Sequence, residues 1–127
     1  QQAEAVEAEK IFGFFASPLG REVLSAPTLR REFKFSILVP AQTYWPQAGE
    51  GERVLLQGVV DCYFEDGDGI TVIDFKTDHV FGSALEERAG EYRPQLEAYA
   101  KALEEITGKK VKRRVLYFFS QGKTVEI

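Results

Sequence analysis

The spacing of apolar residues changes several times along this chain, and each change marks the boundary of a predicted helix or strand. Apolar residues at helical spacing predict a helix over residues 3–16. Ser17-Pro18 ends this helix, and the proline opens a second, shorter helix that runs to about Ala26. Segments rich in β-branched and aromatic residues predict strands at residues 28–39, 53–65, 69–77, 109–119 and 124–127.

A hairpin joins the second and third predicted strands. The segment Asp66-Gly67-Asp68-Gly69 is a strong signal for a two-residue turn with Gly67 and Asp68 at its tip. Counting back from this tip in equal steps along both strands places Asp61 directly opposite Asp74. Strict alternation then divides the apolar side chains between two faces of the hairpin. Val59, Tyr63, Ile70 and Val72 are expected on the face of the two aspartates, and Val60, Cys62, Phe64, Ile73 and Phe75 on the other face.

Apolar residues on both faces predict that this hairpin lies in the interior of a sheet that is covered by helices. A connection over residues 77–90 contains a short helical piece. The clearest helix is expected over residues 91–107, where Gly108 is suited to end it. The pattern as a whole predicts an α/β fold with a central β-sheet flanked by helices.

Length and composition indicate a single domain over residues 1–127. The hydrophobic content of 44% and the aromatic content of 13% are typical of a folded chain. Within this domain we expect a helical lead-in at residues 1–26, a catalytic core at 27–127, and a mobile loop at 40–52, which contains two prolines and two glycines. The chain has no methionine, so we expect it to be a fragment of a longer protein.

Charge and cysteine content exclude several kinds of site. A net charge of −4 argues against a dedicated nucleic-acid clamp, although not against a nuclease that receives its strand from another domain. The single cysteine excludes an internal disulfide and a cysteine-ligated zinc or iron–sulfur centre within the chain. No apolar run is long enough to span a bilayer, and no signal peptide is recognisable, so we expect a cytoplasmic protein.

Two carboxylates and an ammonium group share one face of the predicted hairpin. Directly opposed Cβ atoms lie about 4.5–5.5 Å apart, a distance at which the charges of Asp61 and Asp74 repel. Lys76 falls on the same face because it follows Asp74 by two residues. Magnesium and manganese prefer such oxygen ligands, so the hairpin predicts a divalent-metal site in which Lys76 orients or deprotonates water. The alternative is a solvated hairpin face with an ordinary Asp–Lys ion pair.

Other residues are candidates for the same site. Glu32 on the preceding strand can supply a third carboxylate, and the main-chain carbonyl of Phe75 a further oxygen ligand. Gln95 and Tyr99 lie four residues apart on one helical face, either at the edge of the core or in the site. The basic run at residues 109–114 either contacts phosphates or forms a solvated strand end.

Together these features resemble the RecB-like branch of the PD-(D/E)xK nuclease superfamily. The matching segments, in the order of the family, are Gly58-Val59-Val60-Asp61, Asp74-Phe75-Lys76-Thr77 and Gln95-Leu96-Glu97-Ala98-Tyr99. The segments Arg31-Glu32-Phe33-Lys34-Phe35 and Leu116-Tyr117-Phe118-Phe119-Ser120 make the chain most similar to the C-terminal nuclease domains of AddA-type helicase/nuclease subunits. The resemblance covers nearly the whole chain from about Phe12 onward.

The resemblance implies a restriction-endonuclease-like α/β core with a mixed sheet, and magnesium-dependent hydrolysis of DNA, with manganese as a substitute. The implied substrates are single-stranded ends produced during recombinational repair of double-strand breaks. The implied partners are an AddB-like subunit and helicase domains of the same polypeptide, which bind ATP. The resemblance assigns Asp61 and Asp74 to the metal, Lys76 to catalysis, and Gln95, Tyr99 and Glu32 to the active site.

Several features of the family are missing from this sequence. No histidine precedes Asp61, although the upstream helix of the family often carries one that binds metal. There is no cysteine cluster for an iron–sulfur centre and no Gly-x-x-x-x-Gly-Lys-Ser/Thr loop for ATP. One alternative is a catalytically silent module of the same fold that binds DNA or a partner. Another is a restriction-type or transposon-encoded endonuclease.

Overall fold

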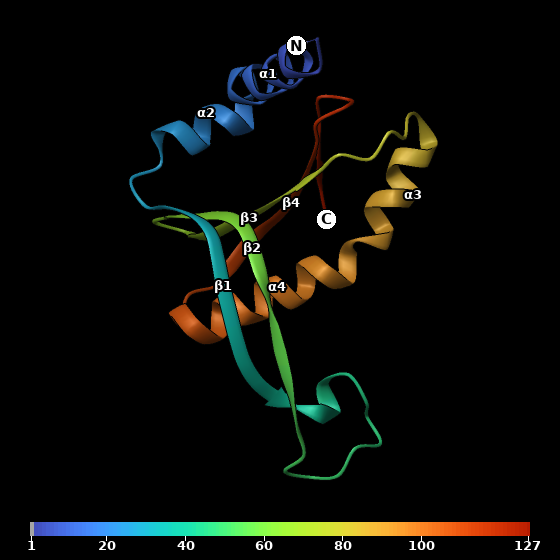
Figure 1. Cartoon of the computed structure of the whole chain (residues 1–127). Coiled ribbons are helices and arrows are strands. Elements are labelled where there is room, and N and C mark those ends of the chain that lie inside the picture. Colours follow the sequence, from blue (N-terminus) through green and yellow to red (C-terminus); the bar gives the residue numbers. More distant parts are fainter. Residues whose placement is uncertain (1) are drawn as a thin grey trace.

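The computed structural model describes residues 2–127, with side chains from Ala8 onward, and places one sheet between two groups of helices (Figure 1). The strands are β1 (Leu29–Pro40), β2 (Arg53–Asp66), β3 (Gly69–Lys76), β4 (Val111–Phe118) and β5 (Lys123–Glu126). The helices are α1 (Gln2–Ala16), α2 (Pro18–Ser25), α3 (Ser83–Glu91) and α4 (Arg93–Thr107), with a 3₁₀ turn, η1 (Ala41–Thr43), after β1.

The sheet is mixed, and its strands follow one another in chain order from β1 to β5. Neighbouring strands are antiparallel except for β3 and β4, which are parallel and are connected through α3 and α4. A parallel pair requires such a long connection, because the chain must return to the end of the sheet from which it started. The predicted α/β fold with a mixed sheet flanked by helices is confirmed.

Local capping explains where several helices begin and end. The Ser17 hydroxyl accepts a hydrogen bond from the Gly20 N–H at 3.1 Å and so caps the start of α2. Gly108 ends α4 in a left-handed conformation with φ of 71°, as predicted. Tyr92 separates α3 from α4, so the helix predicted over residues 91–107 begins later than expected. None of the helices in the described part of the chain is both long and apolar enough to cross a membrane.

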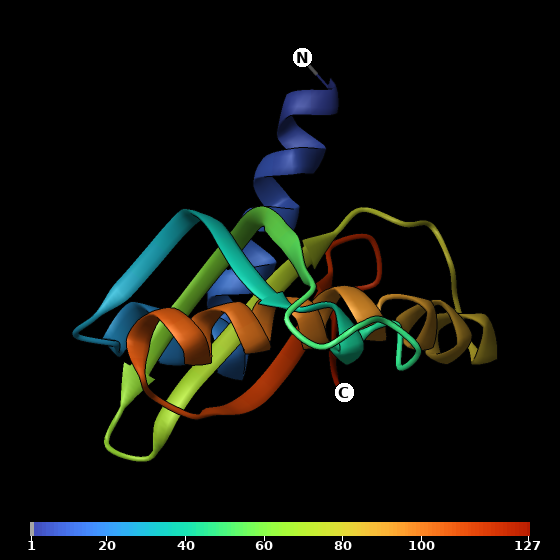
Figure 2. The same cartoon turned by 90° about the horizontal axis from the view of Figure 1, so that it is seen from below.

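Each face of the sheet has a core of its own. Figures 1 and 2 show α4 on one face, and α1 with α2 on the opposite face. Buried residues on the α4 face include Val60, Tyr63, Val72, Leu96, Leu103 and Leu116. Those on the α1–α2 face include Phe14, Leu19, Cys62, Phe64, Ile73 and Tyr117. The hairpin of β2 and β3 therefore has apolar cover on both sides, as its sequence predicts.

The alternation of side chains is interrupted where Glu32 of β1 lies opposite Asp61 of β2. The pairs on either side keep one register, so no residue is inserted into either strand. Glu32 nevertheless has φ of +51°, a left-handed conformation that is rare for a residue with a side chain. Val60 and Cys62, which are two residues apart, consequently belong to opposite cores.

This interruption corrects the predicted faces of β2. Val60 lies on the α4 face together with Tyr63, whereas strict alternation placed these two residues on opposite faces. Val59, predicted to lie beside Tyr63 in the interior, is instead 41% exposed. The prediction for Val59 and Val60 was wrong because alternation assumes regular extended backbone, and that assumption fails next to Glu32.

Residues 40–52 form a compact connection between β1 and β2. The Ala41 N–H donates to the Glu52 carbonyl at 2.8 Å, and the Trp45 N–H donates to the Ala41 carbonyl at 2.8 Å. The Ala48 N–H in turn donates to the Trp45 carbonyl at 2.9 Å. The segment is therefore a hydrogen-bonded turn region, and the mobility expected from its sequence stays a prediction.

Candidate functional site

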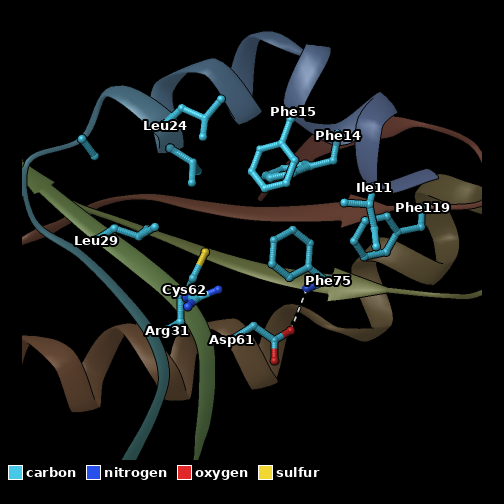
Figure 3. A pocket seen from close by; sticks show the side chains of 12 residues that line it. Ile11, Phe14, Phe15, Leu24, Leu29, Arg31, Asp61, Cys62, Phe75 and Phe119 are labelled. Carbon is cyan, nitrogen blue, oxygen red and sulfur yellow. Dashed lines mark hydrogen bonds between the residues drawn. The ribbon is translucent and has the colours of Figure 1, made fainter. Parts of the chain in front are cut away.

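The predicted hairpin register brings Asp61 and Asp74 to the point where β2 and β3 separate. The backbone pairing, which fits the predicted turn, ends at Cys62 and Ile73. One position further, Asp61 Oδ2 accepts a hydrogen bond from the Phe75 N–H at 2.8 Å (Figure 3). A side-chain oxygen of Asp61 thus accepts the hydrogen bond that a main-chain carbonyl of β2 would accept in a regular ladder. This hydrogen bond fixes the Asp61 carboxylate against β3.

Asp74 is a buried carboxyl group, with 3% of its surface exposed. Burial, followed by a hydrogen bond to the Asp61 carboxyl, raises the pKa of Asp74 from 3.8 to about 7, while Lys76 opposes the rise. Asp74 therefore gives up its proton near neutral pH. It can therefore exchange that proton for a metal cation under ordinary conditions.

The Lys76 ammonium connects this pair of carboxyl groups to α4. Lys76 Nζ lies 2.6 Å from Asp74 Oδ2 and donates a hydrogen bond to Gln95 Oε1 at 2.8 Å. Gln95 Nε2 in turn donates to the Tyr99 hydroxyl oxygen at 3.0 Å. The structure therefore gathers into one cluster the residues that the hairpin and the helix face each predicted separately.

The charge of this cluster suits a divalent cation. Lys76 supplies one positive charge, which offsets only one of the two carboxylates. Among the residues described, the Lys76 ammonium is the cation that pairs with Asp74 Oδ2, and it leaves the charge of the second carboxylate without a counterpart in the cluster. Asp61 and Asp74 are hard oxygen donors, so the residues present fit magnesium or manganese.

Glu32 is not gathered into this cluster. It is exposed and lines, together with Asp61, a polar recess of about 680 Å³ beside β1. Within the described residues, no three Asp, Glu, His or Cys side chains are arranged to hold a metal ion. Glu32 and the Phe75 carbonyl therefore stay predicted ligands, and the two aspartates are the carboxylates that the fold brings together.

A second recess, of about 520 Å³ and mostly apolar, adjoins the first and shares Asp61 with it. Figure 3 shows Phe15 of α1 and Phe75 of β3 lining it, with Asp61 and Arg31 at its edge. Asp61 lines both recesses, whereas Asp74 and Lys76 line neither of them. Asp61 is thus the member of the cluster that borders both recesses.

The basic run at residues 109–114 is largely engaged with acidic side chains. Ion pairs join Lys109 to Glu65, Lys112 to Asp66 and Arg113 to both Glu22 and Glu126. These partners neutralise the charges that a phosphate backbone would need. The arrangement favours the interpretation of this run as a solvated strand end.

Three further residues beside Lys76 were not among the predicted site residues. The Tyr92 ring lies under the Lys76 ammonium, with Nζ 3.9 Å from the ring centroid. Its hydroxyl donates to Asp78, which also pairs with Arg88. The sequence signal for Tyr92 is its place one turn before Gln95 on the same helical face, whereas Asp78 and Arg88 carry no comparable signal.

The free energy of unfolding of the metal-free protein is expected to fall as pH rises from about 4 to about 7. Asp74 has a pKa of about 7 in the folded chain against 3.8 for an unperturbed carboxyl group, so folding takes up a proton between these values. Above about pH 7 the buried charge destabilises the fold fully. Urea unfolding in EDTA, compared between the wild type and Asp74→Asn, measures this contribution. A difference between the two proteins that is constant from about pH 4 to about pH 8 would contradict the prediction.

Comparison with known proteins gives a consistent result. The sequence profile of the PD-(D/E)XK nuclease superfamily matches residues 3–126. The chain is 44% identical over 127 residues to an ATP-dependent helicase/nuclease subunit of Acetivibrio thermocellus, covering 97% of this chain and 10% of that protein. The protein of the same name from Desulforamulus reducens is 44% identical over 130 residues (100% and 10%), and that from Bacillus cereus 42% over 139 residues (100% and 11%). The chain thus spans about a tenth of the length of these relatives.

Proposed function

Because this chain belongs to the PD-(D/E)XK nuclease superfamily, we propose that it is a metal-dependent deoxyribonuclease domain. The observation that carries the proposal is the cluster of Asp61, Asp74, Lys76 and Gln95, in which a buried carboxyl group, a second carboxylate and an ammonium meet. The cluster supplies oxygen ligands for a metal and a cation for a phosphate, which are the groups that phosphodiester hydrolysis requires.

Asp61, Asp74 and the Phe75 carbonyl would hold the metal, which when bound lowers the pKa of coordinated water and offsets charge on the phosphate. Asp61 is oriented for this role by the Phe75 N–H. The Lys76 ammonium orients the attacking water and stabilises negative charge on the phosphate oxygens as the ester bond breaks. Gln95 holds Lys76 through its amide oxygen, and Tyr99 fixes the Gln95 amide. Glu32 borders the recess through which a strand reaches Asp61.

The proposed substrate is a single-stranded DNA end that another domain delivers. The net charge of −4 and the ion-paired basic run give this domain little electrostatic attraction for DNA of its own. The relatives are named as ATP-dependent helicase/nuclease subunits and are about ten times as long as this chain. We therefore place the domain beside ATP-binding helicase domains of the same polypeptide and an AddB-like subunit, in the cytoplasm, acting in recombinational repair of double-strand breaks.

A nuclease assay on the intact protein tests this proposal. End-labelled single strands and blunt duplexes are incubated with magnesium, with manganese or with EDTA, in the absence of ATP. Hydrolysis is expected with either metal and not with EDTA, and the single strand is expected to be cut faster because no unwinding is needed. Absence of hydrolysis with both metals, in a protein that circular dichroism shows to be folded, would favour the catalytically silent module instead.

A further inference from the structure

Besides Asp74 and Gln95, the Lys76 ammonium contacts the ring of Tyr92. The proposed function assigns no role to this ring. Lys76 Nζ lies 3.9 Å from the centroid of this ring, and the Lys76 side chain is only 14% exposed. A cation over an aromatic face is attracted by the negative charge of that face, and the attraction grows as water is removed. The contact is therefore a cation–π interaction in a largely dry setting.

The ring is anchored from the segment that follows β3. The Tyr92 hydroxyl donates to Asp78 Oδ2 at 2.9 Å, and Arg88 Nη1 donates to the same oxygen at 2.8 Å. The main-chain carbonyl of Asp78 accepts a hydrogen bond from Gln121 Nε2 at 2.9 Å. Burial and the hydrogen bond to Asp78 raise the pKa of Tyr92, so its hydroxyl stays a donor. Asp78 thus ties the ring to α3 and to the turn after β4.

The position of Tyr92 in the backbone also favours a fixed ring. Tyr92 is the residue between α3 and α4, with φ of −86° and ψ of −6°. Its N–H donates to the Ala89 carbonyl at 3.1 Å, and its carbonyl accepts from the Leu96 N–H at 3.2 Å. Both helices therefore hold the backbone that carries the ring.

We propose that Tyr92 is a positioning residue for hydrolysis, whose ring face holds the Lys76 ammonium in place between Asp74 and Gln95. The inference rests on the proposed nuclease function. An aromatic face attracts the ammonium without bearing a charge or accepting a proton. The ring therefore fixes the ammonium where it contacts both Asp74 Oδ2 and Gln95 Oε1. Without the ring, the ammonium would keep its attraction to Asp74 Oδ2, 2.6 Å away, but would lose the surface that limits its motion.

The test distinguishes the effect of the ring face on kcat from the effects of the hydroxyl and of the side-chain shape. Tyr92→Phe keeps the ring and loses the hydroxyl, so kcat is expected to stay within about threefold of the wild type. In the intact protein, phenylalanine analogues with one, two and three fluorines at position 92 weaken the ring face stepwise at nearly constant shape. The trifluoro variant and Tyr92→Leu are expected to lower kcat about tenfold, with KM for DNA unchanged. The same fluorinated series at the exposed Tyr44 is the matched control and should leave kcat unchanged.

A second readout does not depend on activity. In proton–carbon NMR spectra of this chain, the Lys76 ε-methylene signal should lie upfield of its random-coil position, because of the Tyr92 ring current. The shift should persist in Tyr92→Phe and vanish in Tyr92→Leu. A normal ε-methylene shift in the wild type, or a kcat that does not change along the fluorinated series, would overturn the inference. If the wild type cuts no DNA while the upfield shift is present, the proposed function fails and the contact between Tyr92 and Lys76 stands.

Discussion

Asp74→Asn is expected to lower metal-dependent DNA hydrolysis by at least about a thousandfold, and to abolish metal binding at the site. Asparagine has nearly the same shape as aspartate, so the buried position can be filled without a cavity. It lacks the negative charge that a divalent cation requires, and its amide would present a donor to Asp61. The loss should therefore be chemical and not structural.

Isothermal titration with manganese and a single-strand nuclease assay measure these two losses on the same preparation. Asp68→Asn is the matched control, since Asp68 lies at the tip of the same hairpin with a side chain that is 90% exposed. This variant should bind metal and cut DNA as the wild type does. Manganese binding of unchanged affinity in Asp74→Asn would refute the assignment of Asp74 as a ligand.

Lys76→Met is expected to lower kcat by roughly a hundredfold or more while the protein still binds metal. Methionine retains most of the length and the apolar character of the lysine side chain, but it cannot donate to water or to a phosphate oxygen. Both aspartates remain in place, so the metal ligands are intact. The variant therefore separates the role of the ammonium from that of the carboxylates.

The comparison must be made at a pH where Asp74 is ionised in both proteins. Lys76 lowers the pKa of Asp74, so its removal raises that pKa further and weakens metal binding near neutral pH. Titration at about pH 8.5 to 9 with manganese, followed by single-turnover assays, avoids this effect. Lys110→Met on the exposed run before β4 is the control. Loss of metal binding equal to that of Asp74→Asn at this pH would contradict the proposed division of roles.

Much of the candidate site could be predicted because its geometry follows from local sequence. The turn at Gly67 and Asp68 sets the register of β2 and β3, and that register alone brings Asp61 and Asp74 to the same place. Lys76 follows from the period of a strand, and Gln95 with Tyr99 from the period of a helix. What these periods could not give is the distance between hairpin and helix, which depends on how α4 packs on the sheet.

The remaining features depend on backbone conformation and tertiary contacts that the sequence pattern does not encode. A left-handed conformation is expected of glycine or asparagine, so nothing in the sequence marked Glu32 as the residue that interrupts the alternation. The anchoring of Tyr92 by Asp78 and Arg88 joins the segment just after β3 to the end of α3. Such contacts are set by the path of the chain from the end of β3 to the start of α4.

The hydrogen bond from the Phe75 N–H to Asp61 Oδ2 affects the conditions under which this domain would bind a metal ion. It leaves Oδ1 as the freer oxygen of Asp61, so the protein offers few ligands to an ion that prefers six. Under the proposed function, water and the phosphate oxygens of a strand would complete the coordination shell, so metal and DNA would each raise the affinity of the site for the other. A domain without a strand would then hold its metal weakly and stay inert. Binding of a DNA end would itself raise the metal occupancy of the site. Cutting would then be confined to strands that have been delivered.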